Sequence, residues 1–148
     1  MQVADIMKRP AVTIESTASI AAAAAKMCDQ NVGLLAVLDR AQLVGVITDR
    51  DIVLRVLACG LDVRTSYVID VMSRDVTVCF DDQSIECAAA KMGDHQFRCL
   101  PVLNRANRLS GILSVDRIAE HYSEHLAGET LGEIVEARSG RSLSELRR

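Results

Sequence analysis

Short apolar runs of strand length alternate with longer helical segments along this chain of 148 residues. In the first half, residues 11–14, 33–38 and 43–47 are such runs. The last two flank the polar turn at residues 39–42, so they predict a hairpin with a buried face.

Two helices separate and follow these strands. Ser19 is a predicted N-cap, and the alanine-rich segment after it predicts a helix to about Gln30. Thr48 opens a second predicted helix, which runs to about Ala58 and is stopped by Gly60.

The same pattern returns 65 residues later, because Asp5-Ile6-Met7 reappears as Asp70-Val71-Met72 and Ala23–Met27 as Ala88–Met92. After a polar turn the offset grows by one residue, so that Thr48 corresponds to Ser114. A repeat of about 60 residues is at the lower limit for a separate core, so we expect the two copies to pack on each other.

The second copy predicts the same elements in the same order. These are a strand at Val76-Thr77-Val78, a helix capped by Ser84 to about Asp94, a hairpin at residues 97–103 and 109–113, and a helix from Ser114 to about Leu126.

The predicted fold class is therefore α+β, with two tandem β-α-β-β-α repeats related by a pseudo-twofold axis. Their boundaries are residues 1–60 and 68–126, with a connector at 61–67 and a helical tail at 127–148. In the tail, Thr130 and Ser142 each begin a capping-box pattern, and a break at Ser139-Gly140 separates them.

Composition excludes some classes of function. The net charge of −3 shows no basic excess, which argues against nucleic-acid binding. No apolar run of about 18 residues predicts a membrane span, and no signal-like segment is visible. Five cysteines without a C-x-x-C pair predict reduced, mostly buried thiols and a cytoplasmic location.

Thr48 and Asp51 form the sharpest local feature, a hydroxyl and a carboxylate three residues apart where a strand ends and a helix begins. A helix N-terminus attracts phosphate, and a carboxylate there accepts hydrogen bonds from a ribose diol. The same spacing also satisfies a helix end as a capping box, with no ligand involved.

Across residues 3–122, both copies resemble the CBS domain, and the tandem resembles the CBS pair, or Bateman module. The likeness rests on Asp5-Ile6-Met7, the Ser19-Ile20 helix start, the strand Gly33–Val37, the signature Gly45–Asp51 and the parallel positions of the second copy. The arrangement is most similar to small stand-alone bacterial CBS-pair proteins.

This resemblance implies a regulatory module that binds an adenine nucleotide or another adenosyl ligand in the cleft between the repeats. AMP, ADP, ATP, S-adenosylmethionine and NAD(H) are the candidate ligands. The implied ribose-binding and phosphate-binding residues are Thr48, Asp51, Arg98 and Ser114, with Arg50 a weaker choice; the implied base-lining residues are Val12, Thr13, Ile14, Val76, Thr77, Val78, Ala36 and Pro101.

The second copy departs from the pattern, because Arg117 stands where Asp51 stands in the first, and Asp116 is displaced by one residue. A helix turns by about 100° per residue, so Asp116 does not replace the carboxylate. We therefore expect at most one competent ribose site, with Ser114 in a degenerate one.

Histidines offer an alternative chemistry, since His121 and His125 are four residues apart on one predicted helix and could share a metal ion. No third ligand is evident, and His95 beside Asp94 shows no catalytic pattern. We therefore predict no metal, no catalytic residues and no enzyme activity.

Two functions remain open at this stage, a ligand sensor and a structural scaffold for dimerisation. The resemblance implies a homodimer, with Ile52, Val53, Val56, Leu57 and Ile118 as candidate seam residues. Neither a membrane nor a nucleic acid is expected as a partner.

Overall fold

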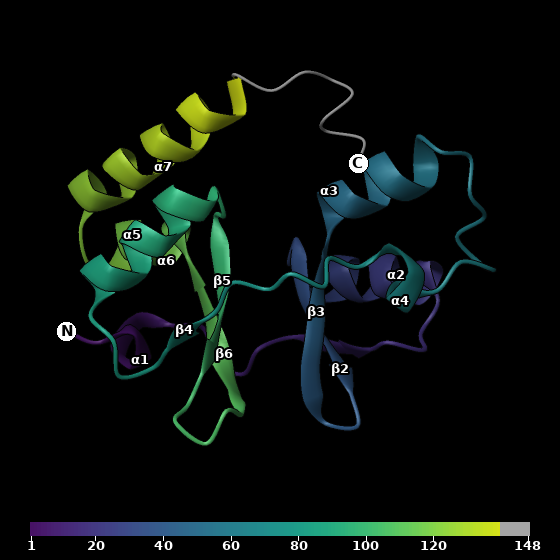
Figure 1. Cartoon of the computed structure of the whole chain (residues 1–148), viewed down its shortest axis with the longest axis horizontal. Coiled ribbons are helices and arrows are strands. Elements are labelled where there is room, and N and C mark those ends of the chain that lie inside the picture. The colour runs from purple at the N-terminus through teal and green to yellow at the C-terminus, as the bar shows by residue number, and fades with distance from the viewer. Residues whose placement is uncertain (140–148) are drawn as a thin grey trace. The chain divides into compact units, whose positions relative to one another are not determined.

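The computed structural model describes residues 1–139. In chain order the elements are α1 Val3–Ile6, β1 Thr13–Glu15, α2 Ile20–Gln30, β2 Leu34–Asp39, β3 Gln42–Thr48, α3 Asp49–Asp51, the π-helix η1 Ile52–Leu57, α4 Val68–Val71, β4 Cys79–Phe80, α5 Ile85–His95, β5 Cys99–Leu103, β6 Leu109–Ser114, α6 Val115–His121 and α7 Glu124–Ser139 (Figure 1). The predicted α+β class and the two tandem repeats are confirmed.

The chain forms two compact units, each with its own hydrophobic core. Of the described residues, unit 1 contains 1–11 and 77–139, and unit 2 contains 12–76. Each unit therefore takes its opening segment from the other copy: α1 packs in unit 1 and α4 in unit 2. The arrangement of the repeats on each other stays a prediction.

Each unit contains a three-stranded sheet with the same topology. In unit 2 the order is β1-β2-β3, with β1 parallel and β3 antiparallel to β2; β4-β5-β6 repeats it in unit 1. Both hairpins shift register at equivalent places, between Val37 and Leu38 and between Val102 and Leu103.

Helices α2 and α5 begin as predicted. Ser19 Oγ accepts a hydrogen bond from the Ala22 amide and Ser84 Oγ from that of Cys87, each at 3.1 Å. Both helices end at a left-handed residue, Asn31 or Gln96, which turns the chain into the next strand.

Each opening segment docks on the last strand of its unit beside a glycine. Lys8 bridges Ile112 and Ser73 bridges Val46. A Cβ at Gly111 would lie 2.6 Å from the Lys8 carbonyl oxygen, and one at Gly45 would lie 2.7 Å from that of Ser73. Both positions therefore need glycine, because the backbones approach too closely for a side chain.

The strand predicted at Val76–Val78 is wrong, since β4 begins only at Cys79. In unit 2 the Ala36 amide donates to the Val12 carbonyl at 3.1 Å and extends the ladder. Its equivalent, Pro101, has no N–H and leaves the ladder short.

The helix predicted from Thr48 to Ala58 exists, but most of it is a π-helix. The Ala58 amide donates to the Val53 carbonyl, five residues back, at 2.9 Å. Gly60 then takes a φ of 72° and ends the segment, as predicted.

The predicted helix end at Leu126 and the capping box at Thr130 are both wrong. α6 stops at His121, and Ser123 Oγ accepts from the Leu126 amide at 3.0 Å to start α7. Thr130 is buried inside α7 and donates to the Leu126 carbonyl. The predicted capping box at Ser142 and the glycine of the predicted break lie outside the described residues.

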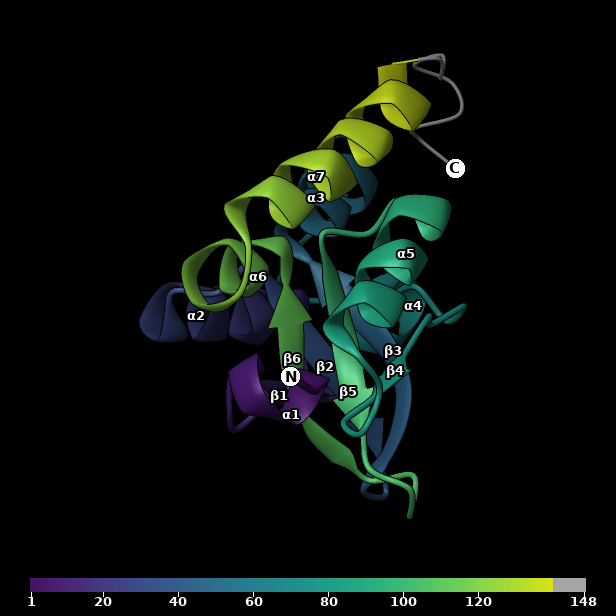
Figure 2. The ribbon, with the colours of Figure 1, turned by 90° about the vertical axis from the view of Figure 1, so that its left-hand side faces the viewer.

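α7 is part of unit 1, where it packs against α5 and α6 (Figure 2). Ala127 and Ile134 are buried in the core. At the contact with α5, Gly93 leaves room for the side chain of Glu133, which a Cβ there would meet.

Candidate functional site

Thr48 and Asp51 form a complete capping box where β3 runs into α3. Thr48 Oγ1 accepts from the Asp51 amide at 3.1 Å, and the Thr48 amide donates to Asp51 Oδ2 at 3.0 Å. The pair therefore does cap the helix. A ligand must use the hydrogen-bonding capacity that the cap does not occupy, above all that of Asp51 Oδ1.

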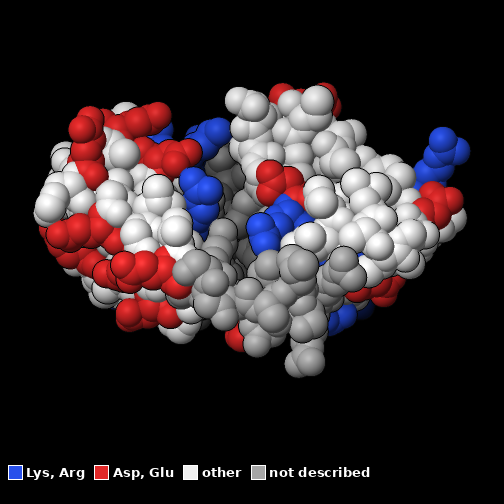
Figure 3. Space-filling view, turned by 90° about the horizontal axis from the view of Figure 1, so that it is seen from above, with Lys and Arg blue, Asp and Glu red and all other residues white. Residues whose placement is uncertain are grey.

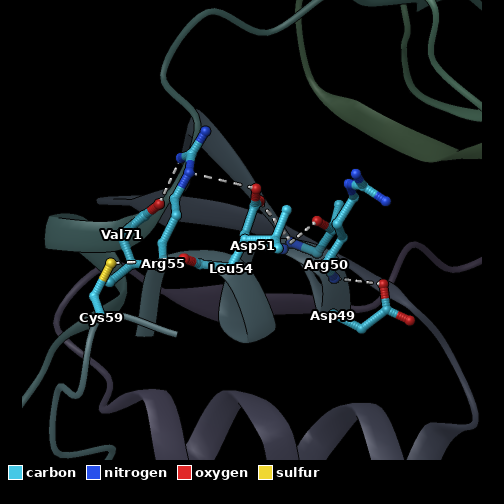
Figure 4. A network of polar contacts seen from close by, with 8 residues as sticks. Asp49, Arg50, Asp51, Leu54, Arg55, Cys59 and Val71 are labelled. Atoms are coloured by element: carbon cyan, nitrogen blue, oxygen red, sulfur yellow. Dashed lines mark hydrogen bonds and ion pairs between the residues drawn. The ribbon is translucent and has the colours of Figure 1, made fainter. Parts of the chain in front are cut away.

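The other carboxylate oxygen of Asp51 is only loosely engaged. Oδ1 lies 3.8 Å from Arg55 Nε, a long ion pair, while Arg55 Nη1 donates to the Val71 carbonyl at 2.8 Å (Figure 4). The Asp51 side chain is 15% exposed. A carboxylate oxygen has room for two donors, so Oδ1 can accept a hydroxyl from outside.

Asp49 and Arg50 take part in the local turn. The Asp49 amide donates to the Gly33 carbonyl at 3.0 Å, and Asp49 Oδ1 accepts from the Arg50 amide at 2.8 Å. Both side chains are exposed, and neither holds Asp51.

The sheet register of unit 2 places several predicted residues on one face. Thr13 pairs with Ala36 and Ala36 with Val46, while Thr48 pairs with Leu34, two positions away on the same face of β2. Ile14, predicted to line the base, instead points into the core of unit 2. Thr13, Ala36 and Thr48 thus lie on one face of the sheet, where Ala36 is fully buried.

In each unit a lysine binds the backbone at the start of the first strand. Lys26 Nζ donates to the Thr13 carbonyl, and Lys91 Nζ to the Val78 carbonyl. Sequence reasoning missed these residues, although their offset of 65 in both copies is a usable signal.

In unit 1 the cap has no carboxylate. Ser114 Oγ accepts from the Arg117 amide at 3.1 Å, and Arg117 Nε donates to the Ile6 carbonyl at 2.8 Å. Arg98 is exposed, and its carbonyl accepts from the Val115 amide at 2.9 Å.

The predicted site residues divide between the units. Unit 2 contains Val12, Thr13, Ile14, Ala36, Thr48, Asp51 and Val76, and unit 1 contains Thr77, Val78, Arg98, Pro101 and Ser114. Their joint role stays a prediction. Arg55 was missed, although its spacing of four from Asp51 on a helix could have identified it.

His121 and His125 do not share a helix, because α6 ends at the first and the second lies in α7. Each contacts a glutamate instead: His121 Nε2 lies 3.4 Å from Glu120, and His125 Nε2 lies 2.9 Å from Glu129. No group of three metal-ligating side chains occurs within residues 1–139.

Many acidic side chains lie on the surface of unit 1 at the end where its helices are (Figure 3).

The prediction of mostly buried cysteines is wrong. Cys28, Cys59 and Cys87 are exposed, because they lie on outer helix faces or in a turn. Cys79 is buried, and desolvation raises the pKa of its thiol from 9.0 to about 11, while the charge of Lys91 acts in the opposite direction. Over the described part of the chain, no helix is long and apolar enough to cross a bilayer.

Comparison with known proteins identifies the class. The model of the CBS domain matches residues 3–58 and 68–124, each including one copy of the repeat. The chain belongs to the CBS-domain family, with two tandem domains.

Relatives include the CBS domain-containing protein YhcV of Bacillus subtilis, which is 36% identical over 133 residues, 89% of this chain and 94% of that protein. Among solved structures, Hypoxic Response Protein I with two coordinated zinc ions is similar, with a TM-score of 0.74 and 32% identity over 82% of this chain and 98% of that one.

A second similar structure is the CBS domain pair of protein MJ0100 in complex with 5′-methylthioadenosine and S-adenosyl-L-methionine. Its TM-score is 0.74, with 29% identity, covering 81% of this chain and 98% of that one.

Proposed function

We propose that this protein is a non-catalytic regulatory module that binds an adenosyl ligand beside the Thr48–Asp51 cap. The observation that carries the proposal is the loosely engaged carboxylate of Asp51, whose Oδ1 lies 3.8 Å from Arg55 Nε while Oδ2 accepts from the Thr48 amide. The MJ0100 domain pair, which carries two adenosyl compounds, supports the ligand class.

The proposed geometry follows from unit 2. A ribose diol donates to Asp51 Oδ1, and the adenine lies toward the sheet face that carries Thr13 and Ala36. Arg98 and Ser114, which belong to unit 1, stay predictions for the phosphate.

Calorimetry and thermal shift with AMP, ADP, ATP, S-adenosylmethionine and NADH test the proposal. A ligand that binds only the folded protein raises its free energy of unfolding, by about 2.7 kcal/mol at a concentration one hundred times Kd. The melting temperature rises with it. We expect at least one compound to bind and Asp51→Ala to lose it. Absence of heat and shift with all five contradicts nucleotide sensing.

Asp49→Ala is the matched control, because it removes a neighbouring carboxylate that makes only a local contact. Its ligand affinity should stay near that of the wild type. Equal losses in both variants would trace the effect to general charge rather than to Asp51.

A dimerisation scaffold is the second candidate, favoured by two exposed apolar residues on η1. Val53 is 51% and Leu57 is 61% exposed. Ile52, Val56 and Ile118, predicted for the same seam, are buried in the cores of their own units and cannot supply it. Light scattering of wild type and of Leu57→Lys decides whether this face associates.

A further inference from the structure

Arg55 links the proposed ligand-binding carboxylate to the segment that leaves unit 2. Its guanidinium lies between Asp51 Oδ1, at 3.8 Å, and the Val71 carbonyl at the end of α4, at 2.8 Å (Figure 4). Val71 and Met72 are buried in unit 2, and the chain then enters unit 1 at Thr77.

Backbone contacts fix the residues that follow Val71. The Met72 amide donates to the Val68 carbonyl at 2.8 Å, and Ser73 exchanges hydrogen bonds with Val46 at 2.9 and 3.0 Å. These amides therefore report whether the end of α4 is held.

Unit 1 has the carbonyl contact without the carboxylate. Ile6 is the equivalent of Val71, but its carbonyl binds Arg117, which stands at the position of Asp51 rather than of Arg55. The position of Arg55 is taken by His121. Within residues 1–139, a carboxylate, a guanidinium and an opening segment form one chain of contacts in unit 2 but not in unit 1.

We propose that Arg55 is a positioning residue that makes the hold on α4 depend on what Asp51 binds. The inference rests on the proposed function, in which a ligand hydroxyl donates to Asp51 Oδ1. When both hydroxyls of the ribose diol donate to that oxygen, they fill its two acceptor positions and displace Arg55 Nε, so the guanidinium loses one of its two anchors. The freed side chain regains rotamers and holds the Val71 carbonyl less firmly.

The coupling can be measured without any ligand, by amide hydrogen exchange. Asp51→Asn removes the charge that attracts Arg55, so exchange at Met72 and Ser73 should rise roughly two- to fivefold, as expected for a partly exposed ion pair. Arg55→Gln should have at least the same effect, and the double variant should add nothing beyond it.

Two controls separate this from general loosening. Asp49→Asn changes a carboxylate on the same turn that does not contact Arg55, and it should leave both amides unchanged. Arg117→Gln should speed exchange at Lys8, the equivalent of Ser73, and leave Ser73 unchanged.

With a bound nucleotide from the calorimetric panel, the wild type should show faster exchange at Met72 and Ser73, and Arg55→Gln should bind without any further change. Unaltered exchange in Asp51→Asn overturns the coupling whether or not a nucleotide binds. A failed nucleotide panel, with the Asp51→Asn effect present, overturns the proposed function and the ligand dependence but leaves the contact chain established.

Discussion

Arg55 and Arg117 stand one turn apart in the alignment of the two copies, yet they donate to the carbonyls of equivalent residues, Val71 and Ile6. In each unit an arginine thus binds the carbonyl of the opening segment, but the two arginines occupy different positions of the repeat. Where Arg117 replaces the carboxylate, the tie needs no arginine further along the helix, and His121 stands there instead.

The cap at Thr48 can be tested apart from ligand binding. Thr48→Ala removes the acceptor for the Asp51 amide but keeps the carboxylate, so stability should fall by about 0.5–2 kcal/mol. Urea unfolding measures the loss. Ser114→Ala removes the equivalent cap contact in unit 1, so it should cost a similar amount of stability.

Replacing Gly45 or Gly111 with alanine should lower the stability of the protein. The added Cβ would lie 2.7 Å or 2.6 Å from a backbone oxygen of the docked opening segment, which cannot move aside cheaply. We expect a loss of roughly 1–3 kcal/mol in each variant by chemical denaturation. A change below a few tenths of a kcal/mol would show that the segments sit more loosely.

Gly128 and Gly132 should behave in the opposite way. Both lie inside α7, and a Cβ at either would meet nothing within 4 Å. Alanine lowers the entropy of the unfolded chain, so each substitution should add about 0.5–1 kcal/mol. Thermal unfolding of the two single variants and the double variant checks this.

Pro101→Ala should lengthen β4. The new amide can donate to the Thr77 carbonyl, as the Ala36 amide donates to that of Val12. Exchange of the amide at position 101 should then be protected like that of Ala36. Fast exchange there would mean that another feature keeps Val76–Val78 out of the sheet.

Cys79 should make stability depend on alkaline pH. Its pKa is raised from 9.0 to about 11 in the folded state, so the folded protein retains its proton where the unfolded chain has lost it. The contribution is complete below pH 9 and is lost as the pH rises toward 11, by roughly 2–3 kcal/mol at most.

Denaturant titrations between pH 8 and 11 measure this dependence, and Cys79→Ala should flatten the curve. In the native protein, a thiol reagent should label Cys28, Cys59 and Cys87 long before Cys79. Equal labelling of all four would contradict the burial of Cys79.

The repeat made most of the fold predictable from sequence. Ser19 and Ser84 identified helix starts because an N-cap is a local contact, and the hairpins followed from continuous apolar runs. The predicted end at Leu126 was wrong because Ser123 caps a new helix whose packing on α5 is a tertiary matter.

The candidate site was predictable only as a pair. Thr48 and Asp51 are close in sequence, but Arg55 matters through Val71, sixteen residues further on, and no spacing rule connects those two. Which of Thr13 and Ile14 faces the core of unit 2 likewise depends on sheet register, which short strands specify poorly from sequence alone.

The exchange of opening segments sets an order of assembly during synthesis. Residues 12–76 can close their core as soon as they have emerged, whereas Val3, Ile6 and Met7 belong with residues made after them, from 77 to beyond 127. Val3, Ile6 and Met7 therefore stay exposed on the nascent chain until the rest of unit 1 has been made, and a chaperone can cover them in that interval.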